Sequence, residues 1–226
     1  MNFPEDFFLD FHAHQRMPAE KEIVIQSLFL QYDLITNTSD KIFFTAGLHP
    51  WHADQLSIEE LKTRLEQFIN SKSIIAVGEA GLDKLKGPDL DVQIEVFKQH
   101  IEIAEKYNLP LIVHSVKAHN EILKLKIESK SKVPWVIHHF NGGKQIATEF
   151  IKHGFYLSVS KHINNEKSRI NHYLGELPIE KIFLETDDFN IDIKYLYEYA
   201  ARKFNMSIED FKKQLIKNLK GLLNEQ

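Results

Sequence analysis

Short apolar runs recur along the chain, and most of them are apolar at nearly every position rather than at every second one. They are rich in β-branched and aromatic residues, which favour strands. A near-continuous apolar pattern is typical of parallel strands that are covered on both faces. We therefore predict eight strands, over residues 7–12, 23–30, 42–47, 74–79, 109–114, 134–139, 155–160 and 181–187.

Between these runs lie segments whose apolar residues recur every three or four positions, as on one face of a helix. Residues 89–108 show this most clearly, through Leu90, Ile94 and Phe97. Ser207 and Asp210 form an S-x-x-D pattern that predicts the start of the last helix. The predicted helices cover residues 57–70, 89–108, 118–130, 143–153, 164–175, 190–204 and 207–223.

Eight strands that alternate with helices favour an α/β barrel of the TIM type, (β/α)8, over an open sheet. Residues 13–41 are the exception, because their connections are too short for full crossover helices. We therefore expect the first two βα units to be irregular. No internal repeat and no linker rich in Gly, Ser and Pro interrupts the chain, so we predict a single domain over residues 1–226.

The composition narrows the classes of protein. With 226 residues, 43% of them apolar and 27% charged, the chain is expected to be globular. A net charge of −4 provides no general attraction for nucleic acid or acidic membranes. The absence of cysteine excludes disulfides, thiolate metal sites and cysteine nucleophiles, and it is compatible with the cytoplasmic location that we expect. No signal peptide or apolar run of membrane-spanning length is present, so no membrane partner is expected.

The first strand ends in the stretch FLDFHAHQ, which places His12 and His14 two residues apart. Side chains alternate between the two faces of a strand, so these imidazoles point the same way. Imidazoles that converge on one point usually hold a divalent metal ion. An H-x-H pair also arises by chance in a chain with twelve histidines, so this pair alone decides nothing.

Four further strands end in ionisable residues. Glu79 ends the fourth strand and His114 the fifth; the sixth ends in His138 and His139, and the eighth in Glu185, Asp187 and Asp188. The carboxyl ends of barrel strands form the rim on which active sites assemble. Burial of so many ionisable groups together is costly unless a cation compensates them.

This candidate ligand set contains nitrogen and oxygen but no sulfur, which suits Zn, Mn or Mg without deciding between them. It exceeds what one tetrahedral ion requires, so we predict two divalent ions bridged by a carboxylate. Such a pair lowers the pKa of a bridging water for hydrolysis, and a neighbouring carboxylate accepts its proton. No G-x-S-x-G elbow, P-loop or G-x-G-x-x-G follows any strand.

At these positions the chain resembles the TatD-like family of metal-dependent hydrolases, within the amidohydrolase-type barrels. The matching motifs occur in order along nearly the whole chain. They are DFHAH (10–14), AGLHPW (46–51), VGEAGLD (77–83), Gln93 with Phe97, LPLIVHS (109–115), KAHNEIL (117–123), IHHFNGG (137–143), LETD (184–187) and IKNLKGLL (216–223).

The resemblance implies a role for each matching residue. The implied metal ligands are His12, His14, Glu79, His114, His138 and Asp187. Glu79 would be shared by both ions, and Asp187 would also take the proton of the attacking water. His138 is preferred to His139 because the family motif has its ligand first. His49 and Asn141 would lie near the substrate, although His49 fits a structural role before a proline equally well. We expect His52, His100, His153, His162 and His172 at the surface or on helix faces.

The family resemblance also implies a metal-dependent phosphodiesterase, typically a deoxyribonuclease that trims single-stranded or damaged DNA from the 3′ end. Two departures weaken the DNA assignment. Val116 and Lys117 stand where many members carry an arginine, and no R-N-E-P segment follows E-T-D. The alternative is a small-molecule amide, ester or phosphoester hydrolase in the same barrel. A metal-holding module without catalysis is the third hypothesis. The oligomeric state is left open.

Overall fold

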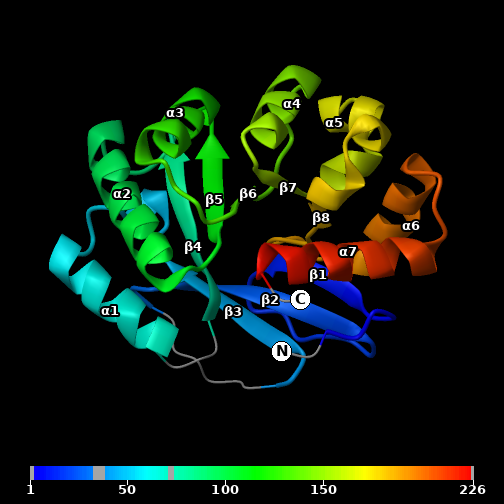
Figure 1. Cartoon of the computed structure of the whole chain (residues 1–226), viewed down its shortest axis with the longest axis horizontal. Coiled ribbons are helices and arrows are strands. Elements are labelled where there is room, and N and C mark those ends of the chain that lie inside the picture. Colours follow the sequence, from blue (N-terminus) through cyan, green and yellow to red (C-terminus); the bar gives the residue numbers. More distant parts are fainter. Residues whose placement is uncertain (1–2, 33–38, 71–73, 225–226) are drawn as a thin grey trace. The chain divides into compact units, whose positions relative to one another are not determined.

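The computed structural model describes residues 3–32, 39–70 and 74–224 (Figure 1). It contains eight parallel strands, hydrogen-bonded in chain order, and the predicted TIM-type α/β barrel is confirmed. The strands are β1 (Phe8–Ala13), β2 (Glu22–Phe29), β3 (Ile42–Gly47), β4 (Ile74–Asp83), β5 (Leu111–Val116), β6 (Trp135–Ile137), β7 (Tyr156–Val159) and β8 (Ile182–Leu184). All eight overlap the apolar runs of the sequence, although β4 extends four residues beyond its run, to Asp83. Strands β6 and β8 are shorter than predicted, at three residues each.

The α-helices follow the predicted periodic segments closely. They are α1 (Ile58–Asn70), α2 (Leu90–Tyr107), α3 (His119–Ser129), α4 (Lys144–Lys152), α5 (Arg169–Tyr173), α6 (Ile193–Lys203) and α7 (Ile208–Leu222). Ser207 caps α7 by accepting a hydrogen bond from the backbone N–H of Asp210, as its S-x-x-D pattern predicts. Within the described ranges, no helix combines the length and apolarity needed to cross a bilayer.

Two parts of the chain are irregular in the structure, namely the described connections before and after β2 and the segment 164–175. The connections 14–21, 30–32 and 39–41 contain no helix, which agrees with the expected irregular start of the barrel; residues 33–38 lie outside the described residues. The helix predicted over 164–175 is only partly right, because α5 is five residues long and follows a separate 3-10 helix, Lys161–Asn164.

The chain groups into two compact units. The first comprises residues 1–26, 40–42 and 138–226, and the second comprises residues 27–39 and 43–137. The single domain expected over the whole chain therefore stays a prediction.

In the first unit, β1 pairs with β2 and β7 pairs with β8, all in parallel. A bridge between Ala13 and Asp187 links the end of β1 to the segment after β8. The core includes a stacked pair, Phe11 and Phe183, with ring centroids 4.0 Å apart. Helices α6 and α7 pack on these strands, and the Tyr197 hydroxyl of α6 accepts the N–H of Leu9 in β1.

In the second unit, β3 to β6 pair in parallel, and α1, α2 and α3 pack against β4 and β5 (Figure 1). The register of β4 against β5 shifts between Val77 and Ala80, which is the mark of a bulge. Gly81 follows with φ 150°, and a Cβ there would lie 2.1 Å from the carbonyl oxygen of His114. Only glycine allows β4 to approach β5 so closely at this point.

Candidate metal centre

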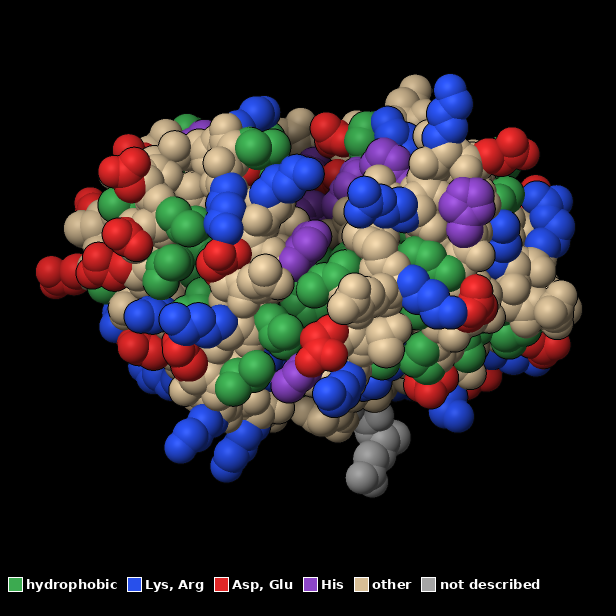
Figure 2. Space-filling model, turned by 90° about the horizontal axis from the view of Figure 1, so that it is seen from above, with side chains coloured by type: hydrophobic (Ala, Val, Ile, Leu, Met, Phe, Trp, Pro, Cys, Tyr) green, Lys and Arg blue, Asp and Glu red, His purple; other side chains and the backbone are tan. Residues whose placement is uncertain are grey.

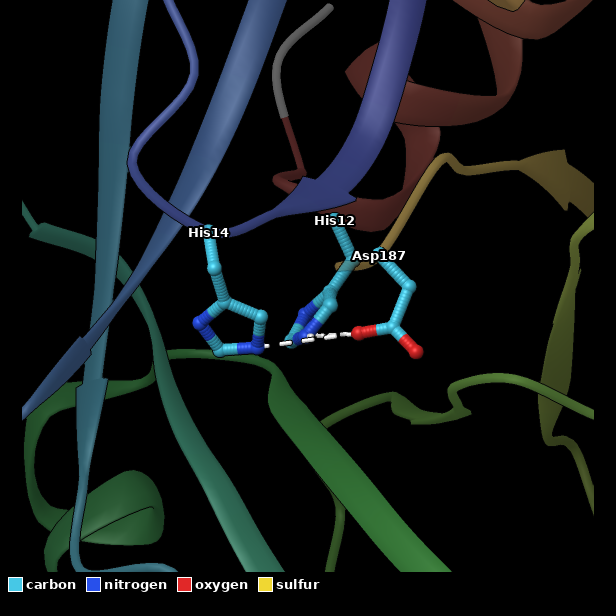
Figure 3. A group of neighbouring side chains, drawn as sticks. All are labelled: His12, His14 and Asp187. Carbon is cyan, nitrogen blue, oxygen red and sulfur yellow. Dashed lines mark ion pairs between the residues drawn. The ribbon is translucent and has the colours of Figure 1, made fainter. Parts of the chain in front are cut away.

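The two histidines of the first strand converge on one carboxylate. His12 lies in β1 and His14 one residue after it, and both imidazoles point toward Asp187 (Figure 3). Their Nε2 atoms lie 3.9 Å and 3.6 Å from Oδ1 of Asp187. The backbone explains this approach, because Asp187 N–H donates to the His12 carbonyl and His14 N–H donates to the Asp187 carbonyl. The bridge between β1 and the segment after β8 thus brings residues far apart in the chain together.

His138 belongs to the same group of side chains in the first unit. Its ring centroid lies 4.4 Å from that of His12, and its Nδ1 lies 3.5 Å from Oε1 of Glu185. His12, His138 and Glu185 are buried. We call His12, His14, His138 and Asp187 the Asp187 cluster. Three imidazoles and one carboxylate in so small a space form a donor set that suits a divalent ion.

His139, which was not among the predicted ligands, forms a hydrogen bond with Asp187. His139 Nδ1 lies 2.7 Å from Oδ2 of Asp187, and its Nε2 lies 3.0 Å from Nε2 of His162. A carboxylate only accepts, so His139 Nδ1 is the donor. The sequence contained no signal for His162, which lies in the 3-10 helix after β7 and is half-buried rather than at the surface.

The environment of Asp187 favours its ionised form. Burial opposes ionisation, but the hydrogen bond from His139 and the neighbouring His138 and His12 outweigh it and lower the pKa of Asp187. The pKa of Glu185 is lowered in the same way, with His138 countering the effect of burial. Both carboxylates therefore offer negative charge next to imidazole nitrogens at neutral pH.

Asp10 does not join the Asp187 cluster, although it lies two residues before His12 and therefore on the same face of β1. Its carboxylate accepts two hydrogen bonds from Thr186, at 2.9 Å from the backbone N–H and at 2.6 Å from the hydroxyl. Arg16 binds both Asp10 and the buried Glu22, at 2.5 Å and 2.6 Å. Burial raises the pKa of Asp10 to about 7, although Thr186 and Arg16 oppose the shift. These hydrogen bonds and ion pairs hold Thr186, the residue next to Asp187, in place.

A second group of ionisable side chains lies in the second unit. Oε1 of Glu79 is 2.6 Å from His114 Nδ1 and 3.1 Å from His49 Nε2, and the two imidazole nitrogens are 3.3 Å apart. All three residues are buried. We call them the Glu79 cluster. The expectation that Glu79 ends its strand is wrong, because β4 continues to Asp83 and the bulge lies around Glu79.

Asp83 supports the Glu79 cluster, a role that the sequence analysis did not assign. Its Oδ2 lies 3.3 Å from Nε2 of His114 and accepts a 2.6 Å hydrogen bond from the indole of Trp51. Burial works against ionisation, but the bonds from His114 and Trp51 lower the pKa of Asp83. A carboxylate on the second nitrogen of a histidine fixes its tautomer and its orientation. The spacing of four residues from Glu79 along one strand is the signal that could have identified it.

The remaining predicted residues take different places. His49 is within the Glu79 cluster and also accepts the N–H of Trp51. Asn141 is exposed and accepts a hydrogen bond from Ser168, so its substrate contact stays a prediction. His100 lies on a face of α2, as expected, but it is fully buried and accepts the N–H of Leu48.

Both clusters fit a divalent ion by the chemistry of their donors. In the Asp187 cluster, His12, His14 and Asp187 each offer one ligand atom, and these atoms lie within 4.8 Å of one another. His49, Glu79 and His114 do the same in the second unit. Two nitrogens and one oxygen are the protein ligands of many catalytic zinc sites.

The face shown in Figure 2 carries side chains of both charges rather than one uniform charge. On the face seen from above, histidine side chains reach the surface, and lysine, arginine and acidic side chains are interspersed around them (Figure 2). Attraction of a polyanion would therefore depend on local contacts.

Comparison with known proteins shows the family of the chain. Residues 25–224 match the family model described as TatD related DNase. An uncharacterized metal-dependent hydrolase of Buchnera aphidicola is 30% identical over 81% of this chain and 74% of its own length. The uncharacterized metal-dependent hydrolase YabD of Bacillus subtilis is 30% identical over 81% of this chain and 78% of its own. The crystal structure of YjjV, a TatD homologue from Escherichia coli, superposes with a TM-score of 0.83 at 20% identity, covering 99% of this chain and 100% of that one. The chain therefore belongs to the TatD-related DNase family, as the sequence motifs predicted.

Proposed function

We propose that this member of the TatD family of metal-dependent hydrolases cleaves phosphodiester bonds in DNA, removing nucleotides from the 3′ end of single strands. The observation that carries the proposal is the presence of two histidine-carboxylate clusters, one half-buried and one buried, in a chain of this family. A cytoplasmic location, expected from the cysteine-free composition, stays a prediction.

The six assigned ligands divide between the clusters. His12, His14 and Asp187 would hold one ion, and Glu79 with His114 would hold the other. His138, whose ring lies beside that of His12, would be the sixth ligand. The sharing of Glu79 by both ions rests on the family resemblance. Divalent ions at these sites would lower the pKa of a water molecule and neutralise charge on the phosphate. Zn, Mg and Mn all suit the nitrogen and oxygen donors.

Asp187 would act as the general base. Its Oδ2 is held by His139, while its Oδ1 is directed toward His12 and His14. An ionised carboxylate fixed in this way can accept the proton of a water molecule that attacks phosphorus. His49, whose Nε2 lies 3.1 Å from Oε1 of Glu79, would orient the substrate in the Glu79 cluster.

A pocket next to His14 and Asp187 favours the second candidate, a small-molecule amide, ester or phosphoester hydrolase. Its volume is about 520 Å³, and Arg16, Asp188, Phe189 and Asp192 help to line it. Arg16 already pairs with Asp10 and Glu22, so the aspartates of the lining dominate its charge. They are Asp187, Asp188 and Asp192. An acidic pocket of this size suits a small neutral or cationic substrate better than a polyanion.

The test is an assay of purified protein with Mg²⁺, Mn²⁺ or Zn²⁺ on single-stranded DNA labelled at either end. We expect loss of label from the 3′ end first, abolished by EDTA. Asp187→Asn should lower turnover about 100- to 10,000-fold with the fold intact, because a general base contributes that much. Asp91→Asn, at an exposed position in the first turn of α2, is the matched control. Cleavage of lactones or cyclic amides with intact DNA would support the second candidate instead.

A further inference from the structure

An exposed aromatic ring lies beside the Glu79 cluster. Trp51 is 39% exposed, and its ring centroid lies 4.6 Å from that of His49 and 6.1 Å from that of His114. Trp135, the other tryptophan of the chain, is fully buried. Trp51 thus presents indole surface next to two of the side chains that could hold an ion.

Hydrogen bonds to Asp83 and His49 hold Trp51 in place. Its indole N–H donates to Asp83, the carboxylate that also binds His114, and its backbone N–H donates to His49. The position of the ring is therefore coupled to the two imidazoles of the Glu79 cluster. A ring that is already held in position loses little conformational entropy when it binds a ligand, so it can orient that ligand relative to the reacting atoms.

An exposed cation accompanies the ring. The Nζ atom of Lys86 lies 4.0 Å from the Trp51 ring centroid, and the side chain is exposed. The backbone of Lys86 is fixed, because its N–H donates to Asp83 and its carbonyl accepts from Gln93. A rigid backbone with a flexible side chain lets the ammonium move between the ring and a bound anion.

Gly87 keeps the two residues together. Its φ is 89°, and a Cβ at this position would lie 2.7 Å from the Pro50 carbonyl oxygen and 2.9 Å from the Trp51 Cα. Another residue here would push the Lys86 loop away from Trp51, so the close approach requires glycine.

We propose that Trp51 and Lys86 form a binding subsite for one unpaired nucleotide, with the base stacked on the indole and the ammonium paired with a phosphate. The inference rests on the proposed nuclease function and names the form of its substrate. Every base has a π-face, so stacking on an aromatic ring tolerates any sequence. A base within a duplex is already stacked on its neighbours, so the subsite selects single strands and frayed ends.

The first experiment measures binding through the fluorescence of Trp51. The Mg²⁺-loaded protein is titrated with a short phosphorothioate oligothymidylate, which resists cleavage, and with an abasic phosphorothioate strand of equal length. We expect saturable quenching by the first strand and little by the second. Trp51→Phe, which leaves only the buried Trp135, should remove the signal. Equal quenching by both strands, or none by either, overturns the proposal.

The second experiment separates stacking from a merely structural role. Trp51→Leu keeps apolar bulk but removes the π-face, and should raise KM for a single-stranded oligonucleotide about tenfold with kcat within about twofold. Trp51→Phe loses the bond to Asp83 but keeps an aromatic face, and should retain most of the affinity. Equal effects of Leu and Phe would show that only the support of Asp83 matters, and would contradict stacking.

Lys86 has a matched control in Lys124, an exposed lysine of α3 that pairs with its helix neighbour Glu128. Lys86→Ala should raise KM and reduce its dependence on salt, whereas Lys124→Ala should change neither. Identical behaviour of the two variants counts against the phosphate contact. A wild-type protein that cleaves no oligonucleotide contradicts the proposed function, while selective quenching of Trp51 by the base-containing strand would still support the subsite.

Discussion

His139 donates a 2.7 Å hydrogen bond from Nδ1 to Oδ2 of Asp187. Both residues have a left-handed backbone, with φ of 48° and 58°, which residues other than glycine adopt rarely. Such conformations concentrate at functional sites, where the surrounding structure maintains them. We therefore infer that His139 orients the carboxylate of Asp187.

Two substitutions test this positioning role. His139→Asn keeps a donor near the position of Nδ1 and tolerates positive φ, whereas His139→Gly removes the donor without backbone strain. We expect the glycine variant to bind Mn²⁺ or Zn²⁺ about 10- to 100-fold more weakly, as for other residues that orient a ligand. Isothermal titration calorimetry measures the difference. Equal affinities of the two variants would show that the hydrogen bond does not matter to ion binding.

The division of the ligands between two clusters predicts how ion content responds to mutation. Elemental analysis after dialysis against Zn²⁺ should find about two ions in the wild-type chain, as the donor count suggests. His14→Ala should lose the ion of the Asp187 cluster alone, and His114→Ala the ion of the Glu79 cluster alone. Glu79→Gln should weaken both if its carboxylate is shared. One ion in the wild-type chain would refute the two-ion assignment.

Arg16 should contribute to stability through the buried carboxylates that it joins. Arg16→Met keeps most of the apolar stem but leaves Asp10 and Glu22 without their shared cation. We expect the free energy of unfolding in urea to fall by about 3 kcal/mol, the usual effect of breaking a buried ion pair. Lys62→Met, which breaks an exposed pair with Glu102, should change it by less than about 1 kcal/mol. Similar losses in both variants would argue against a buried network.

His100 should make the protein sensitive to acid. Burial lowers the pKa of His100 from its usual 6.5 to about 4, so the folded state binds its proton less readily than the unfolded state. Its contribution to stability is complete above pH 6.5 and is lost as the pH falls toward 4, by about 3 kcal/mol in total.

Urea unfolding at several pH values measures this slope. His100→Gln can still accept the N–H of Leu48 but does not titrate, so it should be less stable at pH 7 and lose less stability between pH 6.5 and 4. The difference between the two proteins isolates His100 from the carboxylates. Parallel curves would mean that His100 is not the group responsible.

Much of the fold could be predicted from the sequence because burial leaves a clear pattern. Strands covered on both faces need apolar residues at nearly every position, and all eight runs became strands. The long helices likewise followed their apolar period. The segment 164–175 was predicted less well, because α5 and the short helices beside it are too brief to build a period.

The sequence by itself determined the kind of chemistry, since it placed histidines and carboxylates without cysteine after apolar strands. Only the tertiary structure decided the partners of these residues. Alternation along a strand tells which face a side chain takes but not what it meets there, so Asp10 pairs with Thr186 while His12 meets Asp187. The bulge in β4 and the left-handed backbone of His139 and Asp187 depend on contacts between distant segments. Such contacts leave no periodic trace along the chain.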